Sequence, residues 1–174
     1  MEISAGTDPF ELFQTWFDEA VTAEINDPDA IALASVNADG MPSVRMVLLR
    51  QWSEDGFLFF TNYQSRKSGE LLATGKAAFC MHWKSLRKQV RVTGQLGKAT
   101  AAQSQPLGSR AELMAQVEAH DKKFPDAVTR PPHWGGFCLV PEEIEFWADG
   151  EHRLHDRFRF TRADSGWDIQ RLNP

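Results

Sequence analysis

Residues 143–158 read EIEFWADGEHRLHDRF and carry the most informative pattern in the chain. A strand-like apolar segment ends at Trp147 and is followed by closely spaced basic residues. Arg153, His155 and Arg157 alternate, so on an extended backbone all three side chains point to one face. Three cationic or protonatable donors beside a flat indole suit an anionic, planar aromatic ligand.

An alternative interpretation of the same stretch requires no ligand. Three carboxylates are interspersed among the basic residues, namely Asp149, Glu151 and Asp156. They would neutralise the basic side chains on a solvated strand face. The alternation alone favours the two interpretations about equally, so the rest of the chain has to decide between them.

The composition predicts one globular domain over residues 1–174. This length is sufficient for a domain with its own core, and the apolar fraction of 42% and charged fraction of 25% are ordinary. The net charge of -5 argues against a nucleic-acid-binding protein. We expect an N-terminal helical region over residues 1–26 and a distinct C-terminal segment over residues 133–174.

Cysteine usage and hydropathy predict a cytoplasmic protein. Cys80 and Cys138 are the only cysteines and lie inside apolar runs, as core residues in a reducing compartment do. No apolar stretch approaches the roughly 20 residues of a membrane span, and the acidic N-terminus does not resemble a signal peptide. The histidines and carboxylates follow no recognised metal-ligand spacing, so we expect no metal and no membrane partner.

Periodicity predicts a mainly β fold with flanking helices. Helical spacing of apolar residues predicts a helix at 9–23, capped by Asp8, and further helices at 65–73 and 109–123. Repeated strands separated by turn residues are typical of an antiparallel barrel. The expected strands are 30–36, 43–50, 57–61, 77–83, 89–97, 137–147, 153–162 and 167–172.

The strand RMVLLR at residues 45–50 is a first candidate ligand surface. It places Arg45 and Val47 on one face and Met46 and Leu48 on the other. An arginine followed by aliphatic side chains offers a charged donor to a phosphate and an apolar wall to a flat ring. An ordinary amphipathic strand has the same pattern, so this interpretation stays open on the residues alone.

The segment TNYQSRK at residues 61–67 is a second candidate. It follows a predicted strand and opens a helix, for which Ser65 is the expected cap. Hydroxyl groups and the adjacent cations Arg66 and Lys67 at a helix start form a natural phosphate pocket. A simple capped surface helix has a similar sequence.

These motifs together resemble the pyridoxamine 5'-phosphate oxidase family. Besides the C-terminal stretch, HWGGF at 133–137, RLNP at 171–174 and the N-terminal half from Asp8 to Val90 resemble that family, so the resemblance covers most of the chain. It implies a homodimeric split β-barrel that binds flavin mononucleotide (FMN) in clefts between subunits. In this view residues 133–174 take part in dimerisation and in the active site.

The resemblance also implies a set of FMN-binding residues. Arg45 is expected to contact the phosphate, and its strand lies along the flavin. Gln89 is placed at the edge of the flavin ring, where an amide can both donate and accept. The full implied set is Arg45, Met46, Val47, Leu48, Phe60, Thr61, Arg66, Lys67, Gln89, Gln103, Ser104, Trp147 and Arg157.

The implied reaction is oxidation of pyridoxamine or pyridoxine 5'-phosphate, with a hydride moving to FMN and O2 as the final acceptor. Arg153 and His155 are the implied catalytic and substrate residues, in orienting and electrostatic roles against the pyridine ring and its hydroxyl. Arg50 replaces a family lysine that reaches the substrate phosphate. Its charge is kept, but a forked guanidinium differs from a compact ammonium.

One part of the family pattern is missing. Family members carry a Tyr-x-x-x-Arg-Pro-x-x-Ser segment that grips the substrate phosphate, whereas here residues 92–102, VTGQLGKATAA, run almost directly into Gln103-Ser104. Loss of several charge-assisted bonds, roughly 1.5–3 kcal/mol each, weakens phosphate binding by orders of magnitude. Two alternatives therefore stay open: an oxidase of a larger, unphosphorylated phenazine-like substrate, and a non-catalytic flavin- or pyridoxal phosphate-binding protein.

Overall fold

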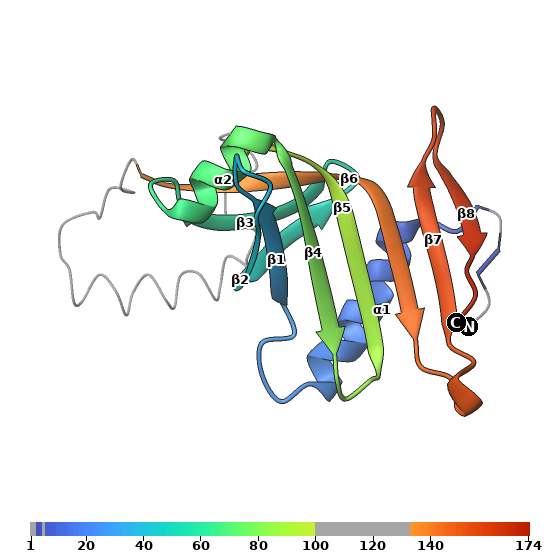
Figure 1. Ribbon diagram of the computed structural model, residues 1–174. Helices are drawn as coiled ribbons and strands as arrows, with labels where there is room; N and C mark the ends of the chain where they lie inside the picture. The colour runs from blue at the N-terminus through green and yellow to red at the C-terminus, as the bar shows by residue number, and fades with distance from the viewer. Residues whose placement is uncertain (1–2, 5, 100–132) are drawn as a thin grey trace.

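The computed structural model describes residues 3–4, 6–99 and 133–174 (Figure 1). Two α-helices, α1 (Pro9–Ala23) and α2 (Arg66–Thr74), and a short 3-10 helix, η1 (Glu151–Arg153), accompany eight strands. The strands are β1 (Ala30–Val36), β2 (Pro42–Ser53), β3 (Gly56–Asn62), β4 (Lys76–Trp83), β5 (Lys88–Lys98), β6 (Trp134–Ala148), β7 (Asp156–Arg162) and β8 (Trp167–Arg171). The helix expected at 109–123, and Gln103 and Ser104, lie outside the described residues.

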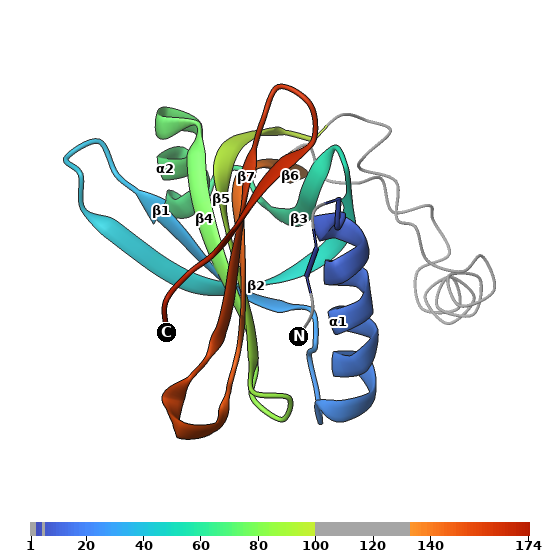
Figure 2. The same cartoon turned by 90° about the vertical axis from the view of Figure 1, so that its right-hand side faces the viewer.

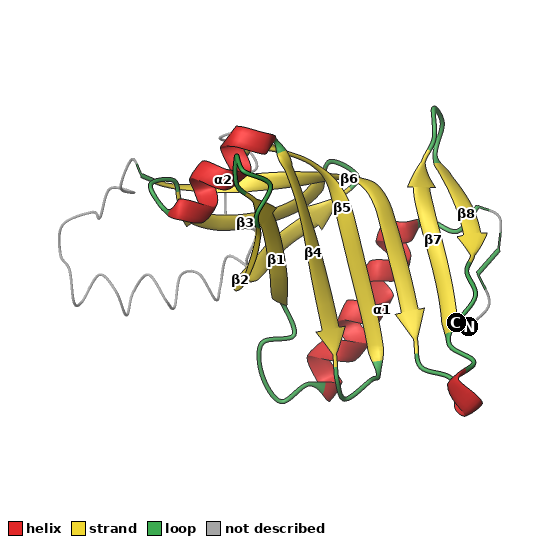
Figure 3. Ribbon diagram, in the orientation of Figure 1, coloured by secondary structure: helices red, strands yellow, loops and turns green. Residues whose placement is uncertain are grey.

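The described strands form one antiparallel sheet in the order β3-β2-β1-β4-β5-β6-β7-β8. Because β3 also pairs with β6, the first six strands in this order close into a barrel (Figure 3). The length of β6 allows this closure, since residues 134–139 pair with β3 while the strand also pairs with β5 and β7. The β7–β8 hairpin continues the sheet beyond the barrel. The prediction of a mainly β barrel with flanking helices is confirmed.

Helix α1 has the bounds that its sequence predicts. The Asp8 carboxylate accepts hydrogen bonds from the backbone N–H groups of Phe10 and Glu11, at 2.6 and 3.3 Å. The helix packs along the barrel (Figure 2), and its Phe13 and Trp16 side chains are buried. Full burial of a side chain such as Phe13 contributes about 1.5–3 kcal/mol, so this face anchors the helix.

The barrel wall has a buried inner face and a partly exposed, apolar outer face. In β1, Ile31 and Leu33 point inward and are fully buried. On the outer side, Val44 and Met46 of β2 are 67% and 63% exposed. Exposed apolar side chains gathered on one side of a sheet are typical of a surface that another molecule covers.

The connection between β6 and β7 corrects the prediction from alternation. Residues 151–153 form η1, and β7 begins only at Asp156, so Arg153, His155 and Arg157 do not share one face of an extended strand. Arg153 has a positive φ of 64°. Gly150 meets the carbonyl oxygen of Leu154 so closely that a Cβ atom would collide with it. The chain therefore turns tightly here, and the period of two is interrupted.

Three further observations concern the cysteines, the helices and the residues that could bind a metal. Cys80 and Cys138 are not joined in a disulfide, and burial raises the pKa of both thiols. Neither α-helix in the described ranges is long and apolar enough to cross a membrane. Within the same ranges, no three or more His, Cys, Asp or Glu side chains form a cluster suited to a metal ion.

Candidate functional site

The start of α2 gathers four of the predicted ligand residues, Arg45, Thr61, Arg66 and Lys67, which we call the α2 group. Ser65 is the N-cap, and its hydroxyl accepts a hydrogen bond from the Ser68 backbone N–H at 3.4 Å. The first turn contains no acidic residue, so its free N–H groups and two cations favour an anion. The cap expected from the sequence is confirmed.

Arg45 joins β1, β2 and α2 through a dense set of hydrogen bonds. Its Nη1 donates to the carbonyl oxygen of Leu33 at 3.1 Å and to the Ser35 hydroxyl at 2.7 Å. Its Nη2 donates to the Ser43 hydroxyl at 2.6 Å and to the Glu70 carboxylate at 3.2 Å. Most of its donors are therefore engaged within the protein, and Arg45 holds β1, β2 and α2 in a fixed arrangement.

Glu70 is a site residue that the sequence analysis missed. Its carboxylate is only 8% exposed and pairs with both Arg45 and Arg66, at 3.2 and 3.4 Å. Hydrogen bonds from the Ser35 and Ser43 hydroxyls are the main cause of a pKa below the ordinary value of 4.5. The spacing of Arg66 and Glu70, four residues apart on a helix, was the available signal for this pair.

Glu70→Gln is expected to make the stability of the fold less dependent on pH in the acid range. Because the folded-state pKa of Glu70 lies below its unfolded value of about 4.5, the ionised carboxylate contributes stability that is fully present above that pH. This contribution is lost as the pH falls through the folded pKa. Thermal unfolding between about pH 7 and about pH 3 should show a steeper acid loss for the wild type than for the variant. Glu54→Gln, at an exposed carboxylate in the β2–β3 turn, is the control, and parallel curves for Glu70→Gln and the wild type contradict the account.

Thr61 has a buried hydroxyl without a partner among the described residues, and Lys67 has an ammonium group whose charge is only partly balanced. Thr61 is 3% exposed, and its Oγ1 atom has no hydrogen-bond partner within residues 3–4, 6–99 and 133–174. A buried hydroxyl without a partner is costly, and in native proteins it is often explained by a ligand. Burial, aided by the nearby charge of Arg45, lowers the pKa of Lys67 below its ordinary 10.5. Both residues would gain from an anionic ligand that accepts hydrogen bonds.

The β2 strand alternates as its sequence predicts. Val47 packs against the core, Met46 points outward, and Leu48 is partly buried. Phe60, the residue before Thr61 in β3, is also partly buried. These residues lie on the strands that carry the α2 group.

Arg50 lies at an irregular point of β2. The pairing with β3 shifts between Leu49 and Gln51, so a β-bulge places Arg50 out of the regular pattern. Its side chain is 51% exposed and pairs with Asp29 at 3.2 Å. The charge predicted for the substrate phosphate is therefore accessible to solvent.

A second set of predicted residues, Trp147, Arg153, His155 and Arg157, gathers at the end of β6 and is called the β6 group. Trp147 pairs in register with Gln89 of β5 on one side and with Arg157 of β7 on the other. The Trp147 and His155 rings lie 4.8 Å apart between centroids. The structure thus brings these residues together, although not through the extended strand that alternation predicted.

Glu145 fixes Arg157 and is another residue that the sequence analysis missed. It is 3% exposed and accepts from Nε and Nη2 of Arg157 at 3.1 and 2.9 Å. Its other carboxylate oxygen accepts from Arg91 at 2.5 Å, and Nη1 of Arg157 donates to the Asn173 carbonyl. Both nitrogens of Arg157 donate to the same oxygen, Oε1 of Glu145, and these charge-assisted bonds together with the bond to Asn173 hold the guanidinium in place.

In one chain helix α2 and the turn between β6 and β7 lie at opposite ends of β4 and β5, as Figures 1 and 2 show. Helix α2 leads into Lys76 at the start of β4, whereas Gln89 pairs with His82 near the end of that strand. Six residues of strand span about 20 Å. The predicted ligand residues therefore form two separate groups within one chain.

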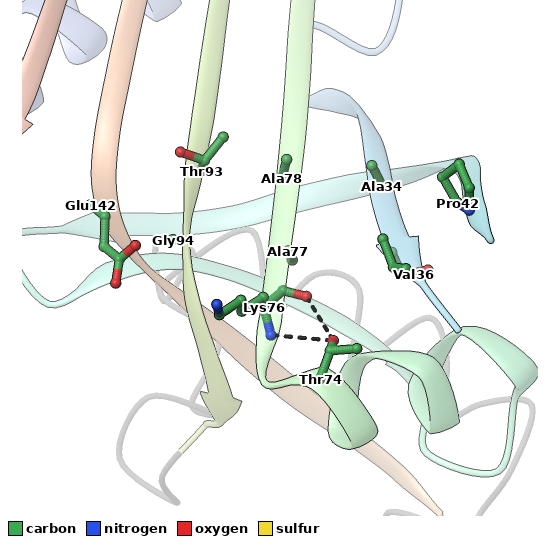
Figure 4. A pocket seen from close by; sticks show the side chains of 11 residues that line it. Ala34, Val36, Pro42, Thr74, Lys76, Ala77, Ala78, Thr93, Gly94 and Glu142 are labelled. Atoms are coloured by element: carbon green, nitrogen blue, oxygen red, sulfur yellow. Dashed lines mark hydrogen bonds between the residues drawn. The ribbon is translucent and has the colours of Figure 1, made fainter. Parts of the chain in front are cut away.

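Two pockets lie near these groups. One, of about 580 Å³, is lined by residues of the β6–β7 turn, including Arg153 and His155. The other, of about 480 Å³, lies over β1, β4 and β5 and is shown in Figure 4, where Thr74 is hydrogen-bonded to Lys76. Apart from Ser35, which holds Arg45, the residues around this second pocket are mostly apolar or solvent-facing.

Family models cover nearly the whole chain. Residues 17–148 match the model described as pyridoxamine 5'-phosphate oxidase. Residues 134–174 match the model described as the pyridoxine 5'-phosphate oxidase C-terminal dimerisation region. Among solved structures, PhzG from Burkholderia lata, in complex with tetrahydrophenazine-1-carboxylic acid, is 30% identical with a TM-score of 0.81, covering 98% of this chain and 95% of that one.

Another solved structure is a pyridoxamine 5'-phosphate oxidase-related, FMN binding protein from Nostoc punctiforme. It is 18% identical, and the superposition covers 98% of this chain and 100% of that one with a TM-score of 0.72, so the two share the fold. The closed barrel and these neighbours define a split-barrel protein. A pyridoxine/pyridoxamine 5'-phosphate oxidase from Roseobacter denitrificans is 49% identical over 98% of this chain and 96% of its own. One from Cereibacter sphaeroides is 48% identical over 99% and 98%. The chain belongs to the pyridoxamine 5'-phosphate oxidase family.

The alignment with the Roseobacter relative also shows a difference in length. It extends over 193 positions, whereas this chain has 174 residues, so at least 19 of those positions have no counterpart here. The two proteins are identical at nearly half of the aligned positions, but the relative contains residues that this chain lacks. This agrees with the missing segment inferred from the sequence.

Proposed function

We propose that this protein is an FMN-dependent oxidase that converts pyridoxamine 5'-phosphate or pyridoxine 5'-phosphate to pyridoxal 5'-phosphate, with O2 as the electron acceptor. The observation that carries the proposal is 49% identity, across nearly the full length, with a relative named for that activity. The residues implied by the family pattern are present in both the α2 group and the β6 group. The proposed reaction class is oxidation of an amine or alcohol carbon by hydride removal.

FMN fits the α2 group. The Thr61 hydroxyl, which has no partner among the described residues, the 80% exposed Arg66 and the partly buried Lys67 supply donors for a phosphate at the start of a helix. When bound, FMN supplies the redox chemistry that the side chains cannot. Gln103 and Ser104 remain predicted contacts of the same ligand.

A homodimer would unite the two groups. The match of residues 134–174 to a dimerisation region supports self-association, as do the exposed apolar side chains of Val44 and Met46. We propose that each site combines the α2 group of one subunit with the β6 group of its partner. The separation of the two groups along β4 and β5 within one chain is the reason for this arrangement.

The β6 group would bind and orient the substrate. Arg153 and His155 line one pocket and supply hydrogen-bonding groups to a pyridine ring and its hydroxyl, while Trp147 offers a flat wall. Arg157, fixed by Glu145, supplies positive charge without side-chain mobility. The exposed guanidinium of Arg50 is the charge proposed to meet the substrate phosphate.

Two other functions remain as alternatives. PhzG, whose structure contains a tetrahydrophenazine-1-carboxylic acid, is more distant than the pyridoxine/pyridoxamine 5'-phosphate oxidases, at 30% against 49% identity. A larger unphosphorylated substrate is therefore the weaker reading. A protein that binds flavin or pyridoxal phosphate without turnover would keep the α2 group but release no peroxide.

The test is peroxide release by the FMN-loaded protein with pyridoxamine 5'-phosphate titrated to high concentration. We expect turnover with a KM raised by about 100-fold over that of a longer relative, equivalent to two lost charge-assisted bonds of roughly 1.5 kcal/mol each. Pyridoxamine without its phosphate is the matched comparison, and its kcat/KM should be lower by about tenfold, since the residual contact is about one charge-assisted bond of roughly 1.5 kcal/mol. No peroxide from either compound, with FMN bound, contradicts the proposal.

A further inference from the structure

The turn between β6 and β7 contains a carboxylate to which the proposed reaction assigns no role. Asp149 follows β6 directly and lines the same pocket as Arg153 and His155. Its side chain is 17% exposed and that of His155 is 24% exposed, so both are largely shielded from solvent. Charged groups at this depth need a defined partner.

One nitrogen of His155 lies between a donor and an acceptor. Nδ1 is 3.1 Å from Oδ1 of Asp149 and 3.3 Å from the backbone nitrogen of Gly150. Without a proton, Nδ1 accepts from the Gly150 N–H, and with a proton it donates to the carboxylate. Nδ1 cannot make both bonds at once, so the partner with the stronger hydrogen bond decides which ring nitrogen carries the proton.

Distance and charge both favour Asp149. Nδ1 lies 3.1 Å from the Asp149 carboxylate as an ion-pair contact, which is closer than the backbone nitrogen of Gly150, whose N–H donates to Nδ1 at 3.3 Å in the structure. A bond to an ionised carboxylate is also roughly twice as strong as one between neutral groups. The preferred neutral ring therefore carries its proton on Nδ1.

Arg87 holds the carboxylate in the place that this bond needs. Its guanidinium pairs with Oδ2 of Asp149, and its carbonyl oxygen accepts from the Asp149 backbone N–H at 3.0 Å. Arg87 adopts a positive φ of 53°, a conformation that costs energy in a non-glycine residue and is often kept at functional sites. The two turns at this end of the barrel thus fix Asp149 from both its backbone and its side chain.

We propose that Asp149 is a positioning residue for His155, which fixes the imidazole proton on Nδ1. Nε2, which has no hydrogen bond to any residue that the structure describes, then faces a ligand as an acceptor for a hydroxyl proton. The indole of Trp147, 4.8 Å from the imidazole ring, helps to hold the ring plane. The role in turnover rests on the proposed function, but the position of the proton does not.

The direct test is the tautomer of His155 in the flavin-free protein. It is measured by nitrogen NMR on isotope-labelled histidine, at a pH high enough for the imidazole to be neutral. We expect the proton on Nδ1 in the wild type. In Asp149→Ala it should move to Nε2, because Nδ1 then accepts from the Gly150 N–H. Asp149→Asn keeps an oxygen acceptor and should restore the Nδ1–H form in part.

Glu151→Ala is the matched control. Glu151 lines the same pocket, and its side chain makes no hydrogen bond or ion pair within residues 3–4, 6–99 and 133–174. Loss of that charge should leave the tautomer unchanged. A proton on Nε2 in the wild type, or the same tautomer in the wild type and in Asp149→Ala, overturns the proposal.

Turnover gives a second, separable result. In the FMN-loaded protein Asp149→Ala should lower kcat by about tenfold or more while FMN affinity stays unchanged, since general acid–base assistance is commonly worth 10²–10⁴-fold. Equal kcat values overturn the role in the reaction even where the tautomer changes. If the wild type itself has no activity, the proposed function fails, while the tautomer comparison still decides the positioning of His155.

Discussion

Arg45→Gln is expected to lower the free energy of unfolding by about 2–3 kcal/mol and the Tm by about 5–10 °C. The change leaves the 8% exposed carboxylate of Glu70 without its ion-pair partner on β2 and removes the bonds from Arg45 to Ser35 and Ser43. The expected loss is below that for a fully buried pair, because Arg45 is 21% exposed and Arg66 still pairs with Glu70. FMN affinity should fall by about 10- to 100-fold. Thermal unfolding and flavin titration measure the two effects.

Arg50→Gln is the control for this prediction. Arg50 lies on the same strand, but its pair with Asp29 is at the surface and its side chain is 51% exposed. Surface ion pairs are worth about 0–1 kcal/mol, so the control should change the Tm little. An Arg45→Gln protein with the wild-type Tm and wild-type FMN affinity contradicts the central position of Arg45.

Thr61→Val is expected to stabilise the flavin-free protein and to weaken its binding of FMN. Valine has nearly the shape of threonine without the hydroxyl, and in the flavin-free protein it removes a buried polar atom that has no partner among the described residues. Such an atom costs about 1–3 kcal/mol, so we expect stabilisation of the flavin-free form by about 1 kcal/mol. If the hydroxyl bonds to FMN, the same variant should weaken FMN binding by about tenfold.

Thr93→Val is the matched control, because Thr93 is exposed on β5. Its effects on stability should remain within about 0.5 kcal/mol, and FMN binding should not change. The sign of the Thr61 result is decisive: a flavin-free Thr61→Val protein that is less stable, with FMN affinity unchanged, shows that the hydroxyl is structural.

The sequence predicts the regular elements well where periodicity and caps agree. Helix α1 and strand β1 have the predicted bounds, because each combines strong apolar periodicity with a clear boundary residue such as Asp8. The alternation of β2 and the Ser65 cap of α2 were also predictable. Local signals of this kind act over a few residues and can be read without knowledge of the fold.

The partners of the charged residues could not be predicted in the same way. Glu70 reaches Ser35 across 35 positions, and the β5–β6 pairing that joins Arg91 to Glu145 spans 54. These contacts depend on sheet register, which is a property of the whole barrel. The prediction that Arg153, His155 and Arg157 share one strand face was wrong because the chain turns after Gly150. The left-handed backbone at Arg153 has no unique sequence signal.

The division of the candidate site into an α2 group and a β6 group also could not be predicted from the sequence. The motifs give residue types, but not the distance of six strand residues that separates Lys76 from His82 along β4. The family pattern names the residues of one site, and the structure shows that one chain supplies them in two places. A second subunit is the physical arrangement that we propose to join them.

The measurement that tests the central claim most directly is the visible absorbance of the FMN-loaded protein on anaerobic addition of pyridoxamine 5'-phosphate. We predict that the flavin absorbance is lost as hydride leaves the substrate, and that it returns when oxygen is admitted. Peroxide and pyridoxal 5'-phosphate should form in equal amounts. An absorbance that remains unchanged at saturating substrate, with FMN still bound, contradicts the proposed oxidase function.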